Sequence, residues 1–550
     1  MPLQSLPEEV LVLILSYLPS HADAAALSLQ CRRWHRLCEM ATRRKYRRVK
    51  LRETSDLAVA FKILQSILKT PRYGRYVRHI ELNRSPTLSY GCAQSYAVHP
   101  PQQSLQLKDQ ERLIVAIRQA GFESPQEQEK MLNILLQDPA SMGSSMGYND
   151  SRTPFLVQTL AALLASVSPL LESLNLCPVG QEPSKLSRLN AQVDGIQLPE
   201  TDYFFKHFLD RVNSGPPKAM PFLQNLRKVR FLVDADEIIW EWYYYQPYDL
   251  YGSLNLVRRL PRVESIRLDG ISEAEDFSVV PPPRSANYTR ITIRNSNMDY
   301  HHLVKTIESA KRLEEFTYAV GGRGSRDGGI SIFSPEHVLR ALLSHDDSLL
   351  HLDLDVEAEI SSAQIFDFRH RRYPYDDDDD DDDDSPPSSD PVYQHEWAEE
   401  LQADDQLIYD HPIYDRSSLC ALRGFTKLKN LSLGIHLLYF LARGIGGDQE
   451  VEEASFAIVD HLPPSLESLC IYGYEKGMKP KDQGLPDNVF DRQLEKLLAE
   501  KDRKLPRLTY IEGIDELIEN AVTVEWPHEN HDDVWERDTG DNWTDHEYDY

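Results

Sequence analysis

The chain has 550 residues, enough for roughly three to four domains of average size. Its composition, 41% hydrophobic and 27% charged, is typical of a soluble globular protein, and its longest apolar run, Val10–Leu15, is far shorter than the ~20 residues that cross a membrane. We therefore expect no membrane helix and no membrane partner. The net charge of −27 argues against general nucleic-acid binding, because phosphates repel an acidic surface.

The first predicted element is a helix over residues 6–18. Ser5 can cap this helix, Glu8 can complete a capping box, and Pro7 falls in the first turn, where no hydrogen bond is lost. Apolar side chains cover one helical face and extend beyond it, and two shorter helices follow up to about Cys38. Three helices of this length bury too little apolar surface to be stable on their own. The surplus apolar surface predicts a docking partner.

The order of these residues resembles the F-box. The pattern covers about Leu3 to Leu51 and contains Leu-Pro-x-Glu-Val-Leu from Leu6, Ile-Leu-x-x-Leu-Pro from Ile14 and Leu-Ser-Leu-x-Cys-Arg-Arg-Trp from Leu27. The F-box docks substrate receptors onto the Skp-type adaptor of SCF (Skp, cullin, F-box) ubiquitin ligases, so the resemblance implies this adaptor, and through it a cullin, as partners. It places the F-box core and the adaptor contacts together on one set of residues: Leu6, Pro7, Val10, Leu11, Ile14, Leu15, Leu18, Leu29, Cys31 and Trp34.

Two features of this region bear on partners and location. Ala24 and Gln30 stand where Leu and Val are usual in the F-box pattern, and we expect them to weaken adaptor affinity. Residues 32–52 contain ten Lys or Arg and a single acidic residue, Glu39. This stretch is either a nuclear localisation patch or a set of long side chains that lie along the helix ends and meet acidic surface elsewhere. We expect a cytoplasmic and/or nuclear location.

Beyond the F-box one pattern recurs, an amphipathic helix and a short strand of the form apolar-x-x-apolar-x-apolar. The central apolar residues of the predicted strands are Val49, Ile80, Leu174, Val229, Ile266, Ile291, Phe316, Leu352, Leu431, Leu469 and Leu508. The predicted helices cover residues 56–69, 155–167, 203–212, 254–260, 301–310 and 335–343, with two more at 110–120 and 126–137. Such a unit cannot bury its own apolar face and must stack on a neighbour. The array resembles the irregular leucine-rich repeats that often follow an F-box; an ordinary α/β domain is the alternative.

The predicted fold is therefore α/β, a short all-α F-box followed by an irregular leucine-rich-repeat solenoid. We assign residues 1–52 to the F-box, 53–523 to the repeat array and 524–550 to an acidic, aromatic tail, which either caps the last repeat or serves as a peptide for a partner. Insertions are expected at about 83–153, 181–200 and 357–417. The last contains nine consecutive aspartates, Asp376–Asp384, which should be disordered and act as a spacer or meet a basic partner.

No residue set in the sequence supports catalysis or metal binding. The six cysteines are scattered, with no zinc-ligand spacing. Gly143–Gly147 matches a nucleophile elbow around Ser145 but follows no predicted strand. His528 and His531 lack the longer zinc motif, and His301-His302 indicates a helix start. We expect no enzyme activity, no cofactor and no metal.

The leading hypothesis is thus a non-enzymatic subunit that binds a Skp-type adaptor through the F-box and an unknown protein substrate through the repeats. Arg323 and Arg326, on a glycine-rich loop, are candidates for gripping an acidic or phosphorylated substrate segment. The alternative is a repeat scaffold that binds protein partners without ubiquitylation.

Overall fold

The computed structural model describes a large part of the chain, in two compact units, Met1–Ser331 and Ile332–Tyr550. The described residues are 6–7, 10–11, 14–15, 26–51, 54–82, 105–137, 153–176, 203–215, 220–231, 238–239, 242–243, 245–273, 279–321, 333–356, 422–443, 456–480 and 485–517. Outside them lie the predictions for Leu18, Ala24, Ser145, Arg323, Arg326, His528, His531, the insertion at 181–200, the aspartate run and the tail from 524.

The first unit begins with short helical segments. Residues 10–11, 14–15 and 26–28 are helical, followed by α3 (Arg32–Cys38) and α4 (Met40–Arg47). Glu39 separates α3 from α4 in a left-handed conformation, with φ of 48°. Strand β1 (Arg48–Leu51) then starts at the residue after α4, so the helical region continues into the sheet without a loop.

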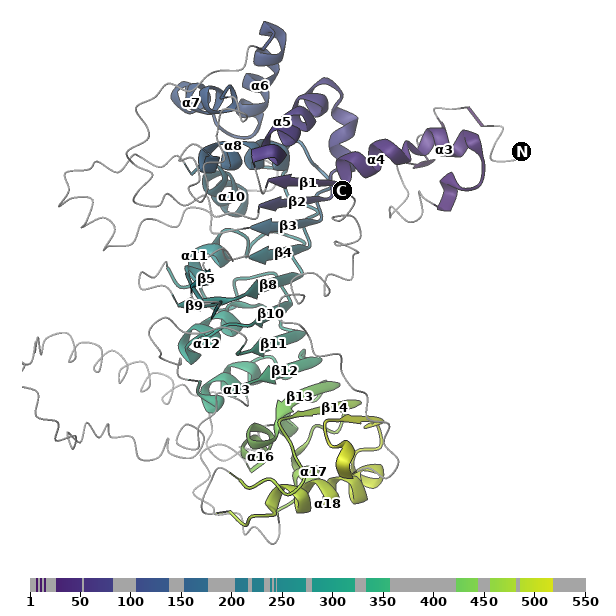
Figure 1. The fold of residues 1–550 in the computed structure, drawn as a ribbon, viewed down its shortest axis with the longest axis vertical. Helices are drawn as coiled ribbons and strands as arrows, with labels where there is room; N and C mark the ends of the chain where they lie inside the picture. Colours follow the sequence, from purple (N-terminus) through teal and green to yellow (C-terminus); the bar gives the residue numbers. More distant parts are fainter. Residues whose placement is uncertain are drawn as a thin grey trace, which may run out of the picture. The chain divides into compact units, whose positions relative to one another are not determined.

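The strands of the first unit lie side by side in chain order and pair in parallel (Figure 1). They are β1, β2 (His79–Leu82), β3 (Ser173–Leu176), β4 (Lys228–Phe231), β8 (Ser265–Asp269), β10 (Arg290–Arg294) and β11 (Glu315–Ala319). The apolar residue at the centre of each predicted strand pairs in register with the next: Val49, Ile80, Leu174, Val229, Ile266, Ile291 and Phe316. These strand predictions are confirmed.

Helices connect most of these strands, because parallel neighbours require a crossover connection. The connection from β8 to β10 has no helix among its described residues. They are α5 (Thr54–Lys69), η2 (Pro71–Tyr76), α6 (Leu107–Gln119), α7 (Pro125–Leu135), α8 (Thr153–Ser166), α10 (Phe204–Ser214), α11 (Leu250–Asn255) and α12 (Tyr300–Ser309). Figure 1 shows α8, α10, α11 and α12 on one side of the strands. The unit is therefore a mixed α/β structure, as predicted.

The region around α11 differs from the sequence prediction. The helix was predicted at 254–260 but begins earlier, because the carboxylate of Asp249 accepts a hydrogen bond from the Gly252 amide (2.9 Å) and caps it. Short strands there were not predicted: β5 (Ile238–Ile239) pairs with β6 (Trp242–Tyr243), and β7 (Gln246–Tyr248) pairs with β9 (Ile271–Glu273). Strands of two or three residues carry too little alternation to be read from sequence.

The second unit repeats the same architecture. Its elements are α13 (Pro335–Leu343), β12 (His351–Asp355), η5 (Leu422–Gly424), β13 (Asn430–Gly434), α16 (Ile435–Arg443), α17 (Ile458–His461), β14 (Ser468–Tyr472), α18 (Val489–Lys504), β15 (Tyr510–Glu512) and η6 (Asp515–Leu517). The strands β12 to β15 pair in parallel, and their central residues are Leu352, Leu431, Leu469 and Ile511. Leu352, Leu431 and Leu469 confirm the predicted positions.

The last strand corrects the prediction, which placed Leu508 at its centre. Leu469 pairs with Ile511, so the repeating pattern of this strand is Leu508, Ile511 and Gly513. Gly513 has φ of 84°, and a Cβ there would lie 1.9 Å from the Ile471 carbonyl oxygen. Only glycine fits this close approach, and its lack of a side chain concealed the third position of the pattern.

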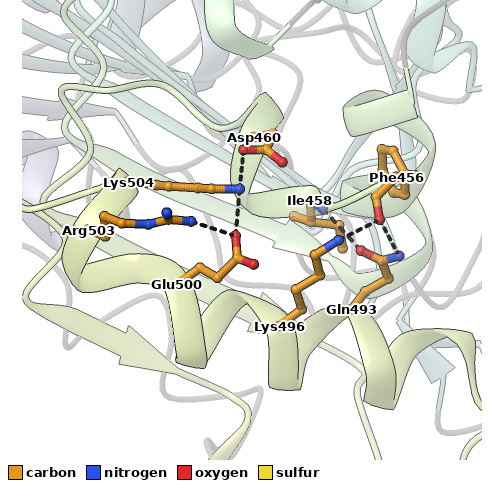
Figure 2. Close-up of polar contacts among 8 residues, drawn as sticks. All are labelled: Phe456, Ile458, Asp460, Gln493, Lys496, Glu500, Arg503 and Lys504. Atoms are coloured by element: carbon orange, nitrogen blue, oxygen red, sulfur yellow. Dashed lines mark hydrogen bonds and ion pairs between the residues drawn. The ribbon is translucent and has the colours of Figure 1, made fainter. Parts of the chain in front are cut away.

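A buried glutamine joins two helices of the second unit (Figure 2). The side chain of Gln493 on α18 accepts a hydrogen bond from the Ile458 amide (3.1 Å) and donates one to the Phe456 carbonyl (3.1 Å), at the start of α17. The first unit uses the same device, because Gln158 on α8 accepts from the Phe205 amide at the start of α10 (3.0 Å). Buried amides thus satisfy helix ends that have no partner within their own helix.

Replacing Gln493 by Met should lower the free energy of unfolding by about 1–3 kcal/mol, because the buried Ile458 amide would lose its partner and the Phe456 carbonyl would keep the longer bond from Lys496 (3.4 Å), while the side-chain volume is nearly kept. Urea denaturation followed by circular dichroism measures the change. Glu495→Met, at an exposed position of the same helix, is the matched control. Equal stability of the two variants would contradict the prediction.

Candidate functional site

The N-terminal helical segments enclose a small apolar core. Four side chains are buried, and none is more than 4% exposed: Leu11, Leu15, Trp34 and Cys38. Partly buried apolar side chains pack against them: Leu6, Ile14, Leu27, Cys31, Leu37 and Met40. The Arg33 guanidinium donates to the Leu6 carbonyl (2.9 Å), which fixes the chain before the first helix against α3. These segments therefore fold around one another.

Beside this core, two large apolar side chains remain open to water. Leu29 is 83% exposed and Val10 is 40% exposed. Leu29 lies in a turn that is closed by a hydrogen bond from the Gln30 amide to the Leu27 carbonyl (3.1 Å), so its backbone is held in place. Pro7 is exposed as well. An ordered backbone that presents apolar side chains to solvent is suited to docking another protein.

The structure thus divides the predicted adaptor-binding residues by burial. Leu11, Leu15 and Trp34 belong to the core, whereas Pro7, Val10 and Leu29 are exposed. Leu6, Ile14 and Cys31 are partly buried and pack against the core, and Leu18 lies outside the described residues. Of the predicted set, the exposed residues are those that a partner can reach first.

Residues 3–48 match the F-box-like family. The chain therefore carries an F-box-like domain at the position where the sequence pattern was found. No curated protein matches the chain.

A cluster of aromatic and charged side chains fixes the F-box-like domain to η2. The Glu39 carboxylate accepts hydrogen bonds from the Arg72 guanidinium (2.9 Å) and the Tyr76 hydroxyl (2.5 Å), both on η2. The Arg43 guanidinium lies 4.8 Å from the centre of the Tyr76 ring, and the rings of Tyr46 and Tyr73 are 4.9 Å apart. Burial, and next the hydrogen bond to Glu39, raise the pKa of Tyr76 to about 12, so the phenol stays protonated as a donor.

This cluster was not anticipated from the sequence. The signal available was Glu39, the single acidic residue in a basic stretch, together with the Tyr73-x-x-Tyr76 spacing on the segment that follows α5. A lone carboxylate among cations is a natural anchor for a second segment, but the sequence did not identify that segment.

The basic stretch is partly engaged in structure. Arg43 donates to the Cys38 carbonyl (2.7 Å), and Arg48 forms an ion pair with Glu81 (2.5 Å). Arg43 and Arg48 therefore have structural roles, as the second interpretation of this stretch expects. Arg44 and Lys45 are exposed, and the nuclear localisation hypothesis stays a prediction.

The chemistry of this site is that of packing. Burial raises the pKa of the Cys38 thiol, with Arg43 opposing, which keeps the thiol protonated and inert. Within the described residues no three His, Cys, Asp or Glu side chains form a group that could hold a metal ion. Nor does the described part of the chain contain a helix with the length and hydrophobicity needed to cross a membrane.

Proposed function

We propose that the chain is the substrate-recognition subunit of an SCF-type E3 ubiquitin ligase. The observation that carries this proposal is the F-box-like domain at residues 3–48, with a buried apolar core and with Val10 and Leu29 exposed beside it. In this proposal, Pro7, Val10 and Leu29 contact a Skp-type adaptor, and the adaptor links the chain to a cullin. The buried Leu11, Leu15 and Trp34 hold that surface in shape.

We further propose that the remainder of the chain is an irregular leucine-rich-repeat array that binds the protein substrate. Support comes from parallel strands in chain order, with their central apolar residues in register and helices as connections. Units of this kind stack on their neighbours and present a continuous row of strands. A row of parallel strands offers one long face on which a protein segment can lie.

The mechanism in this proposal is proximity. The chain is non-enzymatic, and the catalytic chemistry belongs to other subunits. Holding a substrate beside a charged ubiquitin carrier raises the effective concentration of its lysines, so a bimolecular transfer becomes effectively intramolecular. The setting is cytoplasmic and/or nuclear.

Changing Val10 and Leu29 to Asp together should weaken adaptor binding at least about 100-fold, because burying each apolar side chain contributes about 1.5–3 kcal/mol and an unpaired carboxylate opposes burial. Co-purification with the adaptor and titration calorimetry measure the change. The matched control is Val59→Asp with Val115→Asp, two valines that are 55% and 49% exposed elsewhere in the first unit. Undiminished adaptor recovery by the Val10/Leu29 variant would refute the proposal.

The alternative is a scaffold that binds protein partners without ubiquitylation. The F-box-like domain favours the ligase, and two measurements separate the two functions. A ligase subunit co-purifies with a cullin, and its deletion causes a bound protein to accumulate. A scaffold shows neither result.

A further inference from the structure

The connection from β8 to β10 carries an exposed run of prolines, whereas α11 precedes β8 and α12 follows β10. Residues 279–283 read Val-Val-Pro-Pro-Pro, and we call them the proline segment. Val279 is 81% exposed and Val280 is 43% exposed. Pro282 and Pro283 are exposed as well, and Pro281 is buried. Most of this apolar segment is therefore open to water.

The prolines determine the conformation of the segment. A proline ring fixes φ at about −65°, and the residue before a proline is kept out of the helical region. Val280, Pro281 and Pro282 each precede a proline, so the segment takes the polyproline II conformation, an extended helix with about three residues per turn. Residues three apart share an edge of such a helix. With Pro281 facing the protein, the residues on either side of it occupy the two outer edges, as their exposure shows.

Both ends of the proline segment are tied to neighbouring helices. At its start, the side-chain amide of Asn255, the last residue of α11, donates to the Val279 carbonyl (2.6 Å). Directly after its last residue, the Arg284 amide donates to the Glu308 carbonyl of α12 (2.8 Å). Arg284 is in a left-handed conformation, with φ of 51°, which turns the chain away at this point. The segment is therefore held in place before a partner arrives.

The chemistry of the segment excludes two common modes of protein docking. Proline has no backbone N–H, so Pro281–Pro283 cannot supply the hydrogen bonds by which a strand is added to the edge of a partner's sheet. Consecutive prolines also cannot form the amphipathic helix that lies in an apolar groove. The mode that remains is recognition of polyproline II, in which the outer edges of the segment pack between aromatic side chains.

We propose that the proline segment binds a protein domain with a groove lined by aromatic side chains. This inference goes beyond the proposed function, because it adds a partner to the adaptor and the substrate. The segment already has the conformation that such a groove accepts, and its two anchored ends keep it there. Docking therefore costs little conformational entropy, which is the main advantage of a polyproline ligand.

The test uses the full-length chain and a panel of purified WW, SH3 and EVH1 domains, with binding measured by surface plasmon resonance. We expect at least one of these domains to bind the chain, and Pro282→Ala combined with Pro283→Ala to weaken that binding at least about tenfold, because both exposed rings are lost. A soluble polyproline peptide should compete with the unmodified chain for the groove. The matched control is Pro169→Ala with Pro261→Ala, two exposed prolines elsewhere in the first unit, which should leave the affinity within about twofold.

Other outcomes overturn the proposal. It fails if no domain of the panel binds the unmodified chain, or if the Pro282/Pro283 variant binds as well as the unmodified chain does. It also fails if light scattering shows a dimer that the Pro282/Pro283 variant dissociates, since a second copy of the chain would then be the occupant. Should the thermal unfolding midpoint of this variant fall, Val279→Glu, at the position that is 81% exposed, decides by the same tenfold criterion.

The adaptor and the aromatic groove should bind independently. The Pro282/Pro283 variant should still co-purify with the adaptor, and the Val10/Leu29 variant should still bind the domain from the panel. If the Val10/Leu29 change abolishes binding of that domain, the domain contacts the F-box-like surface and the inference about the proline segment is wrong.

Discussion

Replacing Asp269 by Asn should lower the free energy of unfolding of the first unit by about 3–5 kcal/mol, the cost of removing one partner from a buried ion pair. The change is nearly isosteric, so no cavity contributes. What is lost is the buried carboxylate charge that lies 3.6 Å from the Arg230 guanidinium, next to the in-register position of Arg267. Hydrogen exchange read by mass spectrometry should show faster exchange in β4, β8 and β10.

The matched control is Glu264→Gln, just before β8. Glu264 is 53% exposed and lies 3.9 Å from Arg227, so its ion pair is screened by water and contributes roughly 0–1 kcal/mol. If Asp269→Asn costs no more than this control, the negative charge at Asp269 is not what holds the arginines together.

Replacing Trp34 by Ala should unfold the F-box-like domain while the strands remain folded. A buried Trp→Ala change costs about 3–5 kcal/mol, and a domain of this size has little stability beyond that amount. Hydrogen exchange should therefore lose protection across residues 26–38 and keep it in β1, β2 and β3. Adaptor binding should be lost with it.

His35→Ala is the control, because His35 is exposed on the same helix, α3. This experiment also separates core from surface: Trp34→Ala should lose both protection and adaptor binding, whereas the Val10/Leu29 variant should lose adaptor binding alone. Retained protection in Trp34→Ala would mean that the buried cluster does not hold the domain together.

Much of the fold could be predicted because each strand repeats one local rule. The spacing of Ile266 and Leu268, or of Leu431 and Leu433, reports burial against a helix, and burial sets the register with the next strand. The rule failed at β15, where both Leu508 and Ile511 satisfy the spacing and Gly513 has no side chain to decide between them.

The candidate docking surface was predictable as a set of residues but not as a surface. Val10 and Leu11 are consecutive in the sequence, and both were predicted to belong to the same apolar face of the first helix. In the structure Leu11 is buried and Val10 is exposed. The side of the first helix that becomes buried depends on where Trp34 and Cys38 pack against it, and this tertiary contact cannot be read from the local sequence. The joint formed by Glu39 and Tyr76 was missed for the same reason, since its partners are 37 residues apart.

Because α4 runs directly into β1, the length of α4 fixes the orientation of the F-box-like domain relative to the first strand. An α-helix turns by about 100° and rises 1.5 Å with each residue, so the length of α4 sets the angle at which the F-box-like domain leaves the first strand. One residue more or fewer in α4 would swing the docking residues to another side without altering a single docking side chain. The direction in which Val10 and Leu29 face relative to the strands is therefore set by the number of residues between Glu39 and Arg48. Substitutions do not change this number, whereas a single insertion or deletion does.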